Sequence, residues 1–204
     1  MTGHLGLGSQ APVGILGKNC EAWLEVDLAC LFGDFFSVPI HTAMGQRAVT
    51  HVISEAKLSV VFCSFAELDR VIQASKTCSC LRTVVLFSQT AGDLAAGGTG
   101  TTGDVAAGGT GSSKVKTATS ILTTTTLPVL TARGATDTTT KLQKRAPGTL
   151  HTAIYTSGST GMAKGVMIGD ECWNNEMISY LSKLALSTLS YMPVSHITDR
   201  LMPT

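Results

Sequence analysis

Charged residues are scarce in this sequence of 204 residues. Asp, Glu, Lys and Arg together make up 14%, whereas about 25% is usual in globular proteins. The formal net charge is +1, so the chain has no basic excess that would attract a nucleic acid or an anionic membrane surface. Hydrophobic residues still reach 44%, which is enough for a buried core. We therefore expect a globular protein without a nucleic-acid partner.

The six cysteines do not form the dense pattern of a disulfide-bonded scaffold. Their neighbours are apolar, as in the segment VVFCSF around Cys63, which is typical of buried, reduced thiols. One residue separates Cys78 from Cys80, whereas zinc sites usually place about two to four residues between such ligands. No pair of histidines accompanies them, so we predict no metal site.

Targeting and membrane-spanning segments are also missing. The N-terminal segment MTGHLGLGSQAP has neither the basic nor the apolar region of a signal peptide. No apolar run approaches the roughly 18 residues of a transmembrane helix. We expect a soluble intracellular protein without a signal peptide or transmembrane segment.

Short apolar runs alternate with amphipathic stretches between Val13 and Phe87. The β-branched runs predict buried strands, and the apolar residues at helical spacing predict helices between them. Buried strands separated by helices are typical of a parallel sheet covered on both faces, with right-handed crossovers. The predicted fold class is α/β. Strands are predicted at Val13–Leu16, Phe36–Ile40, Leu58–Cys63 and Thr83–Phe87, and helices at Cys20–Phe32, Gln46–Ala56 and Ala66–Ala74.

Two residues suggest details of this first part. Asn19 is of a type that caps helix N-termini, so we expect it to cap the first helix. Pro39 has no amide hydrogen, which predicts that its strand ends there or lies near an edge of the sheet.

The composition changes in residues 88–148. GDLAAGGTGTT at Gly92–Thr102 is followed directly by GDVAAGGTGSS at Gly103–Ser113, a nearly identical tandem copy. Sequence rich in glycine, alanine and threonine offers too little apolar surface to offset the entropy lost on ordering. Two copies are also too few for a solenoid. We predict a long disordered Gly/Ala/Thr-rich insertion over residues 88–148, in which only Ile121–Leu130 has the character of a marginal strand.

Order is predicted again for residues 149–204. A strand at Leu150–Ser157 runs into a turn of glycine, serine and threonine, and a second strand follows at Gly165–Ile168. Beyond this strand, Asp170 is predicted to cap a helix over Glu171–Lys183, and a last strand is predicted at Ser187–Val194.

The turn between these two strands combines residues that bind phosphate. The segment TSGSTGMAKG, Thr156–Gly165, contains three glycines, four hydroxyl side chains and one lysine. Glycines allow successive backbone amides to point at one anion. The hydroxyls can donate to phosphate oxygens, and Lys164 adds a positive charge. Clusters of this kind also form ordinary surface turns, so the residue types alone leave both interpretations open.

Other glycine-rich loops are excluded by spacing. The Walker-type P-loop requires GxxxxGK[ST], but Ala163 precedes Lys164 and Gly165 follows it. The hydrolase elbow requires GxSxG, and Ser157 stands where its first glycine would be if Ser159 were the nucleophile. No GxGxxG follows the first strand, so a dinucleotide site is excluded as well.

The loop resembles the signature YTSG[ST]TGxxKG of adenylate-forming enzymes, which here reads YTSGSTGMAKG at Tyr155–Gly165. The segment VGILGKNCEAWLEVDLACLFGDFFSVPIHTAM, Val13–Met44, resembles the early part of long-chain fatty acyl-CoA synthetases. LSYMPVSHITDRL at Leu189–Leu201 resembles the YLPLxH…R segment of the same family. The three matches occur in family order along the chain.

This resemblance implies a fold and an activity. Residues 1–87 and 149–204 would be the first and second parts of an AMP-binding domain, an incomplete parallel-sheet N-terminal domain of the adenylate-forming type. The implied activity is that of a long-chain fatty acid–CoA ligase, which uses ATP with Mg²⁺, a fatty acid and coenzyme A as co-substrate. Related enzymes work in the cytosol and at several membranes. The implied location is therefore cytoplasmic or peripheral at an organelle membrane.

The resemblance also implies roles for single residues. His196 would lie at the acyl/adenylate pocket, and Tyr191 and Arg200 would support the structure of the same segment. No complete catalytic set is implied within this chain. The ATP phosphates would be held by Thr156, Ser157, Gly158, Ser159, Thr160, Gly161 and Lys164.

Several parts of the family have no counterpart here. Nothing resembles its metal-binding glutamate motif, its adenine and ribose contacts, or its C-terminal domain with the catalytic lysine. We therefore expect a fragment that is inactive alone and that exposes apolar surface where the missing part would pack. Two alternatives stay open: a non-catalytic nucleotide-binding or interaction module derived from such an enzyme, and another adenylate-forming ligase acting on a different carboxylic acid.

Overall fold

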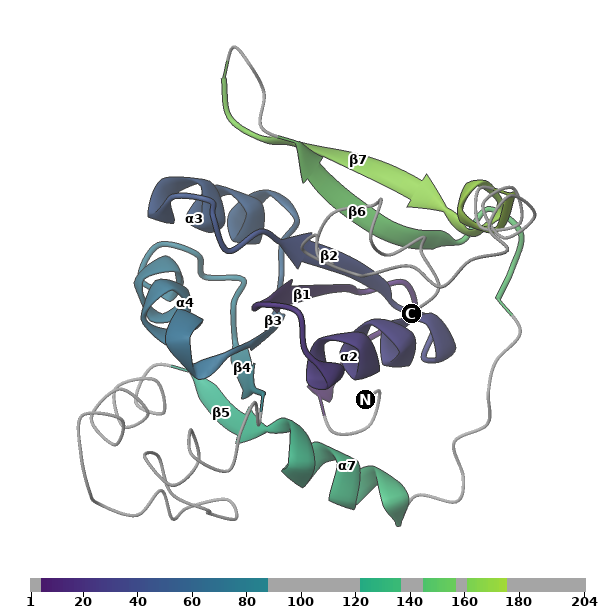
Figure 1. The fold of residues 1–204 in the computed structure, drawn as a ribbon, viewed down its shortest axis with the longest axis horizontal. Coiled ribbons are helices and arrows are strands. Elements are labelled where there is room, and N and C mark those ends of the chain that lie inside the picture. The colour runs from purple at the N-terminus through teal and green to yellow at the C-terminus, as the bar shows by residue number, and fades with distance from the viewer. Residues whose placement is uncertain (1–4, 88–121, 137–144, 157–160, 176–204) are drawn as a thin grey trace.

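A single mixed sheet organises the protein. The computed structural model describes residues 5–87, 122–136, 145–156 and 161–175 (Figure 1). Within them, seven strands lie in the order β5-β4-β3-β1-β2-β6-β7. Neighbouring strands are parallel except for the antiparallel pair β6 and β7. The predicted α/β class and parallel sheet are confirmed. The strands are β1 Pro12–Leu16, β2 Phe36–Ile40, β3 Val60–Cys63, β4 Thr83–Leu86, β5 Thr123–Thr126, β6 Leu150–Thr156 and β7 Lys164–Gly169.

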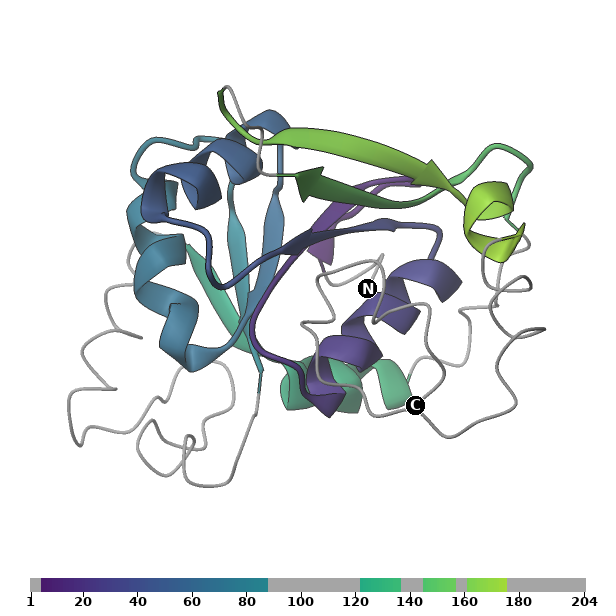
Figure 2. The same cartoon turned by 45° about the horizontal axis from the view of Figure 1, so that its top comes forward.

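Helices cover both faces of this sheet. Figure 2 shows α3 and α4 on one face and α2 and α7 on the other. A further helix covers residues 170–175 and follows β7 directly. The described residues contain no helix long and apolar enough to cross a bilayer. The bounds are α2 Glu21–Phe32, α3 Gln46–Glu55, the 3-10 turn η1 Phe65–Glu67, α4 Leu68–Ser75 and α7 Leu127–Ala135.

The strands are continuously apolar because both of their faces are buried. In β3, Val61 and Cys63 belong to the core beneath α3 and α4, while Val60 and Phe62 belong to the core beneath α2. This alternation follows from the two-residue period of a strand. Burial also raises the pKa of the Cys63 thiol, as expected for a reduced cysteine in a core.

The predicted helix cap is wrong, whereas the first of the two alternatives predicted from Pro39 is confirmed. The first helix is capped by Cys20, whose carbonyl accepts the amide hydrogens of Trp23 and Leu24, and not by Asn19. β2 ends at Ile40, directly after Pro39, as predicted. The edge alternative does not apply, because β2 is an interior strand between β1 and β6. Pro39 is tolerated there because the pairing of β2 with β6 is limited to a single residue pair.

Residues 122–136 are ordered, although they fall within the predicted insertion. The marginal strand predicted at Ile121–Leu130 is present in part, as β5 Thr123–Thr126, whose threonines pair with β4 in parallel from Thr83↔Thr123 to Leu86↔Thr126. Its last four predicted residues are helical. The helix α7 follows at once, with Pro128 in its first turn. The prediction of disorder over residues 88–148 is therefore wrong for residues 122–136. The tandem copies and the predicted strand at Ser187–Val194 lie outside the described residues.

Candidate functional site

The predicted phosphate loop is the turn of the β6–β7 hairpin. β6 runs parallel to β2, so its C-terminal end lies at the carboxyl edge of the sheet, where open α/β sheets bind ligands. Thr156 and Lys164 are paired at the mouth of the turn, and Thr156 Oγ1 lies 3.5 Å from the carbonyl oxygen of Lys164. The structure thus brings these two predicted residues together. Residues 157–160 and His196 lie outside the described residues.

Most of the described residues of the loop face solvent, and Ala163 is the buried exception among them. Thr156, Gly161 and Lys164 are all exposed, so Lys164 can approach a bound anion without losing a buried partner. A Cβ atom added at Gly161 would meet nothing within 4 Å. Packing against the described residues therefore does not require a glycine there.

Gly165, at the other end of the loop, is required by packing. A Cβ atom added there would lie 3.0 Å from Tyr155 Cζ and 3.2 Å from its hydroxyl oxygen. Tyr155 is paired with Gly165 across the hairpin, and its ring lies over the space that a side chain would need. The ring of Tyr155, the first residue of the motif, thus explains why the motif ends in a glycine at Gly165.

Tyr155 joins the hairpin to α3. Its ring packs against the core beneath α3 and α4. Desolvation by burial, followed by the nearby carboxylate of Glu55, raises the pKa of Tyr155 from 10.0 to about 12. The phenol is therefore neutral at physiological pH.

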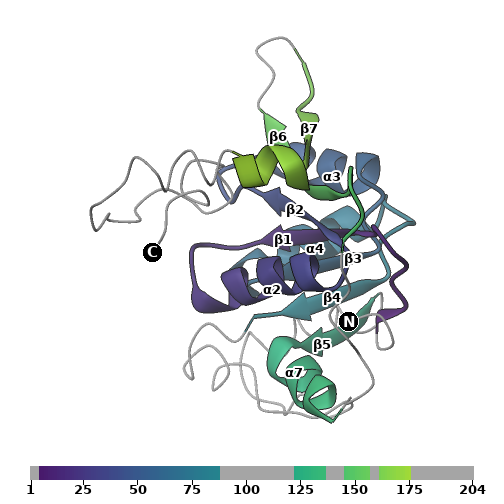
Figure 3. The ribbon, with the colours of Figure 1, turned by 90° about the vertical axis from the view of Figure 1, so that its right-hand side faces the viewer.

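His51 makes a second contact from α3 to the hairpin. Its Nε2 atom lies 2.9 Å from the carbonyl oxygen of Ala163 and 3.3 Å from Glu55 Oε2. Both oxygens are acceptors, so Nε2 carries the hydrogen. Figure 3 shows α3 beside the ends of β6 and β7. Sequence reasoning missed His51 and Glu55, although their i, i+4 spacing on a predicted helix was a usable signal.

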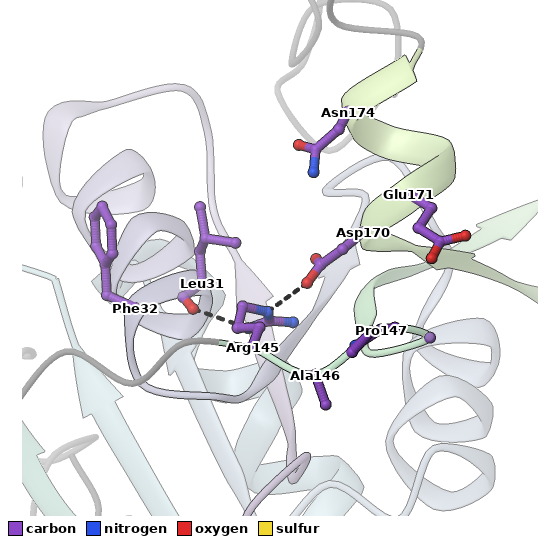
Figure 4. Close-up of a pocket in the computed structure, with 9 residues that line it drawn as sticks. Leu31, Phe32, Arg145, Ala146, Pro147, Asp170, Glu171 and Asn174 are labelled. Carbon is purple, nitrogen blue, oxygen red and sulfur yellow. Dashed lines mark hydrogen bonds and ion pairs between the residues drawn. The ribbon is translucent and has the colours of Figure 1, made fainter.

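An arginine cluster lies at the opposite end of the hairpin (Figure 4). Arg145 Nε donates to Asp170 Oδ2 at 2.6 Å, and its Nη1 donates to the carbonyl oxygens of Leu31 and Phe35 at 2.8 Å and 3.1 Å. The remaining nitrogen, Nη2, donates to the carbonyl of Leu150. The cation thus satisfies orphan carbonyls at the C-terminal end of α2, where a positive charge is favoured.

Asp170 does not cap the helix from outside, as the sequence suggested. The helix begins at residue 170 itself, and the second carboxylate oxygen, Oδ1, lies 3.2 Å from Nδ1 of His151. His151 in turn stacks on Trp173, with ring centroids 4.2 Å apart and an angle of 11° between the planes. The carboxylate is held by two partners, so this cluster fixes the position of the helix.

A cavity of about 410 Å³ opens beside this cluster. Its walls include Leu31, Phe32 and Asn174, with Arg145 and Asp170 at one side (Figure 4). Every nitrogen of Arg145 is already engaged, so its charge is not available to a ligand. The cavity lies at the amino end of β6, away from the loop. Within the described ranges, no group of three or more His, Cys, Asp or Glu side chains could hold a metal ion.

A family model described as "AMP-binding enzyme" matches residues 1–204. The chain belongs to the AMP-binding enzyme family. In this AMP-binding enzyme chain, the signature lies at the turn between β6 and β7, at the carboxyl edge of the mostly parallel sheet.

Two named relatives are acyl-CoA synthetases. Long chain acyl-CoA synthetase 2 of Arabidopsis thaliana is 25% identical over 199 residues, which cover 93% of this chain and 27% of the relative. Fatty acyl-CoA synthetase B of Dictyostelium discoideum is 25% identical over 203 residues, covering 98% and 28%. The chain therefore spans little more than a quarter of the length of these curated relatives.

Solved structures share the fold. The A domain of carboxylic acid reductase from Segniliparus rugosus, in complex with AMP and a co-purified carboxylic acid, matches with a TM-score of 0.76 at 16% identity. The match covers 98% of this chain and 32% of that one. A putative long-chain-fatty-acid CoA ligase from Rhodopseudomonas palustris matches with a TM-score of 0.68 at 15% identity, covering 97% and 42%. At these identities the likeness shows the fold alone.

Proposed function

We propose that this chain is part of a long-chain fatty acid–CoA ligase and that its loop Thr156–Gly165 holds the phosphates of ATP. The observation that carries the proposal is the position of the signature. Its threonine and lysine are paired and exposed at the mouth of a turn, at the carboxyl edge of an α/β sheet. The acyl-CoA synthetase names of the relatives support the choice of a fatty acid.

The reaction proceeds in two displacements. A fatty acid carboxylate attacks the α-phosphate of ATP, which forms acyl-AMP and releases pyrophosphate. The thiol of coenzyme A then attacks the acyl carbonyl and releases AMP. Both steps depend on positioning and charge neutralisation. Lys164 offsets the negative charge of the phosphates, and the open backbone at Gly161 lets them approach closely.

The other loop residues complete this binding site in the proposal. Ser157, Gly158, Ser159 and Thr160 add amide and hydroxyl donors to those of Thr156. His196 lines the acyl/adenylate pocket. Mg²⁺ prefers oxygen ligands, and the described residues bring no suitable cluster together. No step of the proposal therefore passes through the ion.

The whole reaction is assigned to the longer enzyme and not to this chain alone. The chain spans 27% of the length of the Arabidopsis relative, and the resemblance implies no complete catalytic set within it. We expect nucleotide binding without turnover. Pyrophosphate release with ATP, Mg²⁺, a long-chain fatty acid and coenzyme A should stay at background, and robust release would contradict this assignment.

Competition between ligands tests the phosphate-binding role directly. A fluorescent ATP analogue is bound to the full 204-residue chain and then displaced with inorganic pyrophosphate or with adenosine. Because the loop contacts phosphates, pyrophosphate should displace the probe at lower concentration than adenosine does. Stronger displacement by adenosine would show that the chain recognises the base, and the proposed role of the loop would be wrong.

A further inference from the structure

Two limbs of the signature loop are joined to one helix through three side chains. His51 and Glu55 lie one turn apart on α3, and Tyr155 lies at the end of β6. We propose that these three residues, the α3 anchor, are positioning residues that hold the two described ends of the signature loop, Thr156 and residues 161–165, in place for phosphate binding. This proposal rests on the proposed function of that loop.

The C-terminal limb is held at Ala163. Its carbonyl accepts a hydrogen bond from His51 Nε2 at 2.9 Å. Ala163 is 9% exposed, whereas its neighbours Met162 and Lys164 are both exposed. The backbone is thus fixed one residue before the lysine, while the lysine side chain stays free to face a ligand.

The N-terminal limb is held at Tyr155. The residue directly precedes Thr156, and its ring packs against the core beneath α3 and α4. Its ring lies over Gly165 on the opposite limb. A movement of Tyr155 would therefore disturb both ends of the loop.

Glu55 supports His51 within the anchor. Its Oε2 atom lies 3.3 Å from the His51 Nε2 that also contacts the carbonyl oxygen of Ala163. None of the three side chains of the anchor is among the residues proposed to contact phosphate, so the effect of the anchor on binding is indirect. A loop fixed before the ligand arrives loses less conformational entropy on binding.

A positioning role can be distinguished from a stabilising role, because the hairpin does not depend on the anchor for its pairing. The β6–β7 ladder pairs six residues of each strand without help from α3. Loss of the anchor should therefore leave the hairpin paired and Lys164 charged, but should let the loop adopt more conformations. The expected result is weaker phosphate binding with little change in the temperature of thermal unfolding.

The test compares His51→Ala and Glu55→Ala with wild type, using the ATP analogue and hydrogen–deuterium exchange of the amides in residues 161–165. Loss of one neutral hydrogen bond should weaken ATP binding by about 2- to 10-fold and speed exchange in the free protein. His51→Gln should restore most of the affinity, because its amide can still donate to the Ala163 carbonyl. Arg47→Ala is the matched control, since Arg47 is an exposed residue of the same helix.

Three outcomes would overturn the proposal. One is wild-type affinity and exchange in both alanine variants. Another is a loss of affinity no larger than that of Arg47→Ala. The third is a fall in thermal stability with faster exchange across the whole sheet, which would mean a purely structural role. If wild type does not bind ATP, the proposed function fails, but local exchange in residues 161–165 still decides whether the anchor holds the loop.

Discussion

At the scale of single residues, the loop depends on side chains outside its own motif. Tyr155 begins the signature, yet its ring and hydroxyl face α3 and not the open side of the turn. Gly165 ends the signature and leaves room for that ring. The exposed lysine between them is the residue whose charge is available. The motif thus mixes residues that build the turn with residues that can contact a ligand.

Alkaline pH should destabilise the fold through Tyr155. Its folded pKa is raised from 10.0 to about 12, so the fold favours the protonated phenol. The resulting stabilisation is fully present below pH 10 and is lost as pH rises towards about 12. The free energy of unfolding, measured with denaturant across this window, should fall more steeply for wild type than for Tyr155→Phe. Parallel curves for the two proteins would contradict the raised pKa.

The two glycines that flank Met162 and Lys164 should respond differently to alanine. Gly165→Ala would place a Cβ atom 3.0 Å from Tyr155, and we expect it to lower the free energy of unfolding by about 1 kcal/mol through overpacking. Gly161→Ala meets nothing within 4 Å and should leave stability nearly unchanged. Denaturant unfolding of the two variants checks this, and equal losses would show that the ring does not occupy that space.

At the scale of elements, the hairpin is fixed at both ends. The α3 anchor holds the loop end, and Arg145 holds the other end to α2 and to the helix at residues 170–175. Because α2 and α3 lie on opposite faces of the sheet, the hairpin is tied to both helical layers.

Removal of the arginine should destabilise the whole protein. Arg145 and Asp170 have side chains only 11% and 16% exposed, so Arg145→Met leaves a largely buried carboxylate without its cation. Loss of one partner of a buried pair costs about 3 kcal/mol. The double variant Arg145→Met/Asp170→Asn should cost less, because no unpaired charge remains. A double variant less stable than Arg145→Met in denaturant unfolding would contradict this explanation.

The sequence predicted best those elements whose residues are buried on both faces. β1 to β4 follow from apolar runs, and their burial is complete or nearly so. β5 is a run of threonines that becomes a strand through its pairing with β4, which local sequence shows only weakly. Arg145 could not be predicted as a structural residue, because it lies in a segment of low complexity. Its side-chain partner Asp170 is distant in sequence, and its other partners are backbone carbonyls, which no residue type marks.

The candidate site was predicted in part, for a similar reason. Thr156, Gly161 and Lys164 belong to a contiguous motif, and the structure places them at one turn. His51 and Glu55 reach that turn from a helix about a hundred residues earlier. The hydrophobic pattern of α3 predicts its buried face but not the partners of its polar residues, because those depend on where β6 and β7 lie.

At the scale of the whole molecule, α2 has apolar residues on two sides. Trp23, Val26 and Cys30 are buried in the core. Leu24, Leu28 and Phe32 recur every four residues and are 38%, 52% and 53% exposed. This outer stripe is the kind of apolar surface that soluble proteins usually cover. It agrees with a chain that spans about a quarter of its relatives.

A dye that binds apolar surface should report this stripe. We expect the 204-residue chain to enhance the fluorescence of anilinonaphthalene sulfonate under native conditions, and Leu28→Ser/Phe32→Ser to reduce the enhancement. Leu24 is left intact so that the N-terminal end of α2 is unchanged. Unchanged fluorescence in the double variant, with the fold retained by circular dichroism, would show that the stripe is not the exposed surface.

The central claim is that the loop Thr156–Gly165 binds the phosphates of ATP, and Lys164 tests it most directly. Equilibrium titration with ATP should give binding about ten-fold weaker for Lys164→Ala than for wild type, because a charge-assisted contact to phosphate is lost. Lys76→Ala is the control, since Lys76 is an exposed lysine at the C-terminal end of α4, and it should bind as wild type does. Equal ATP affinity for Lys164→Ala and wild type would contradict the account.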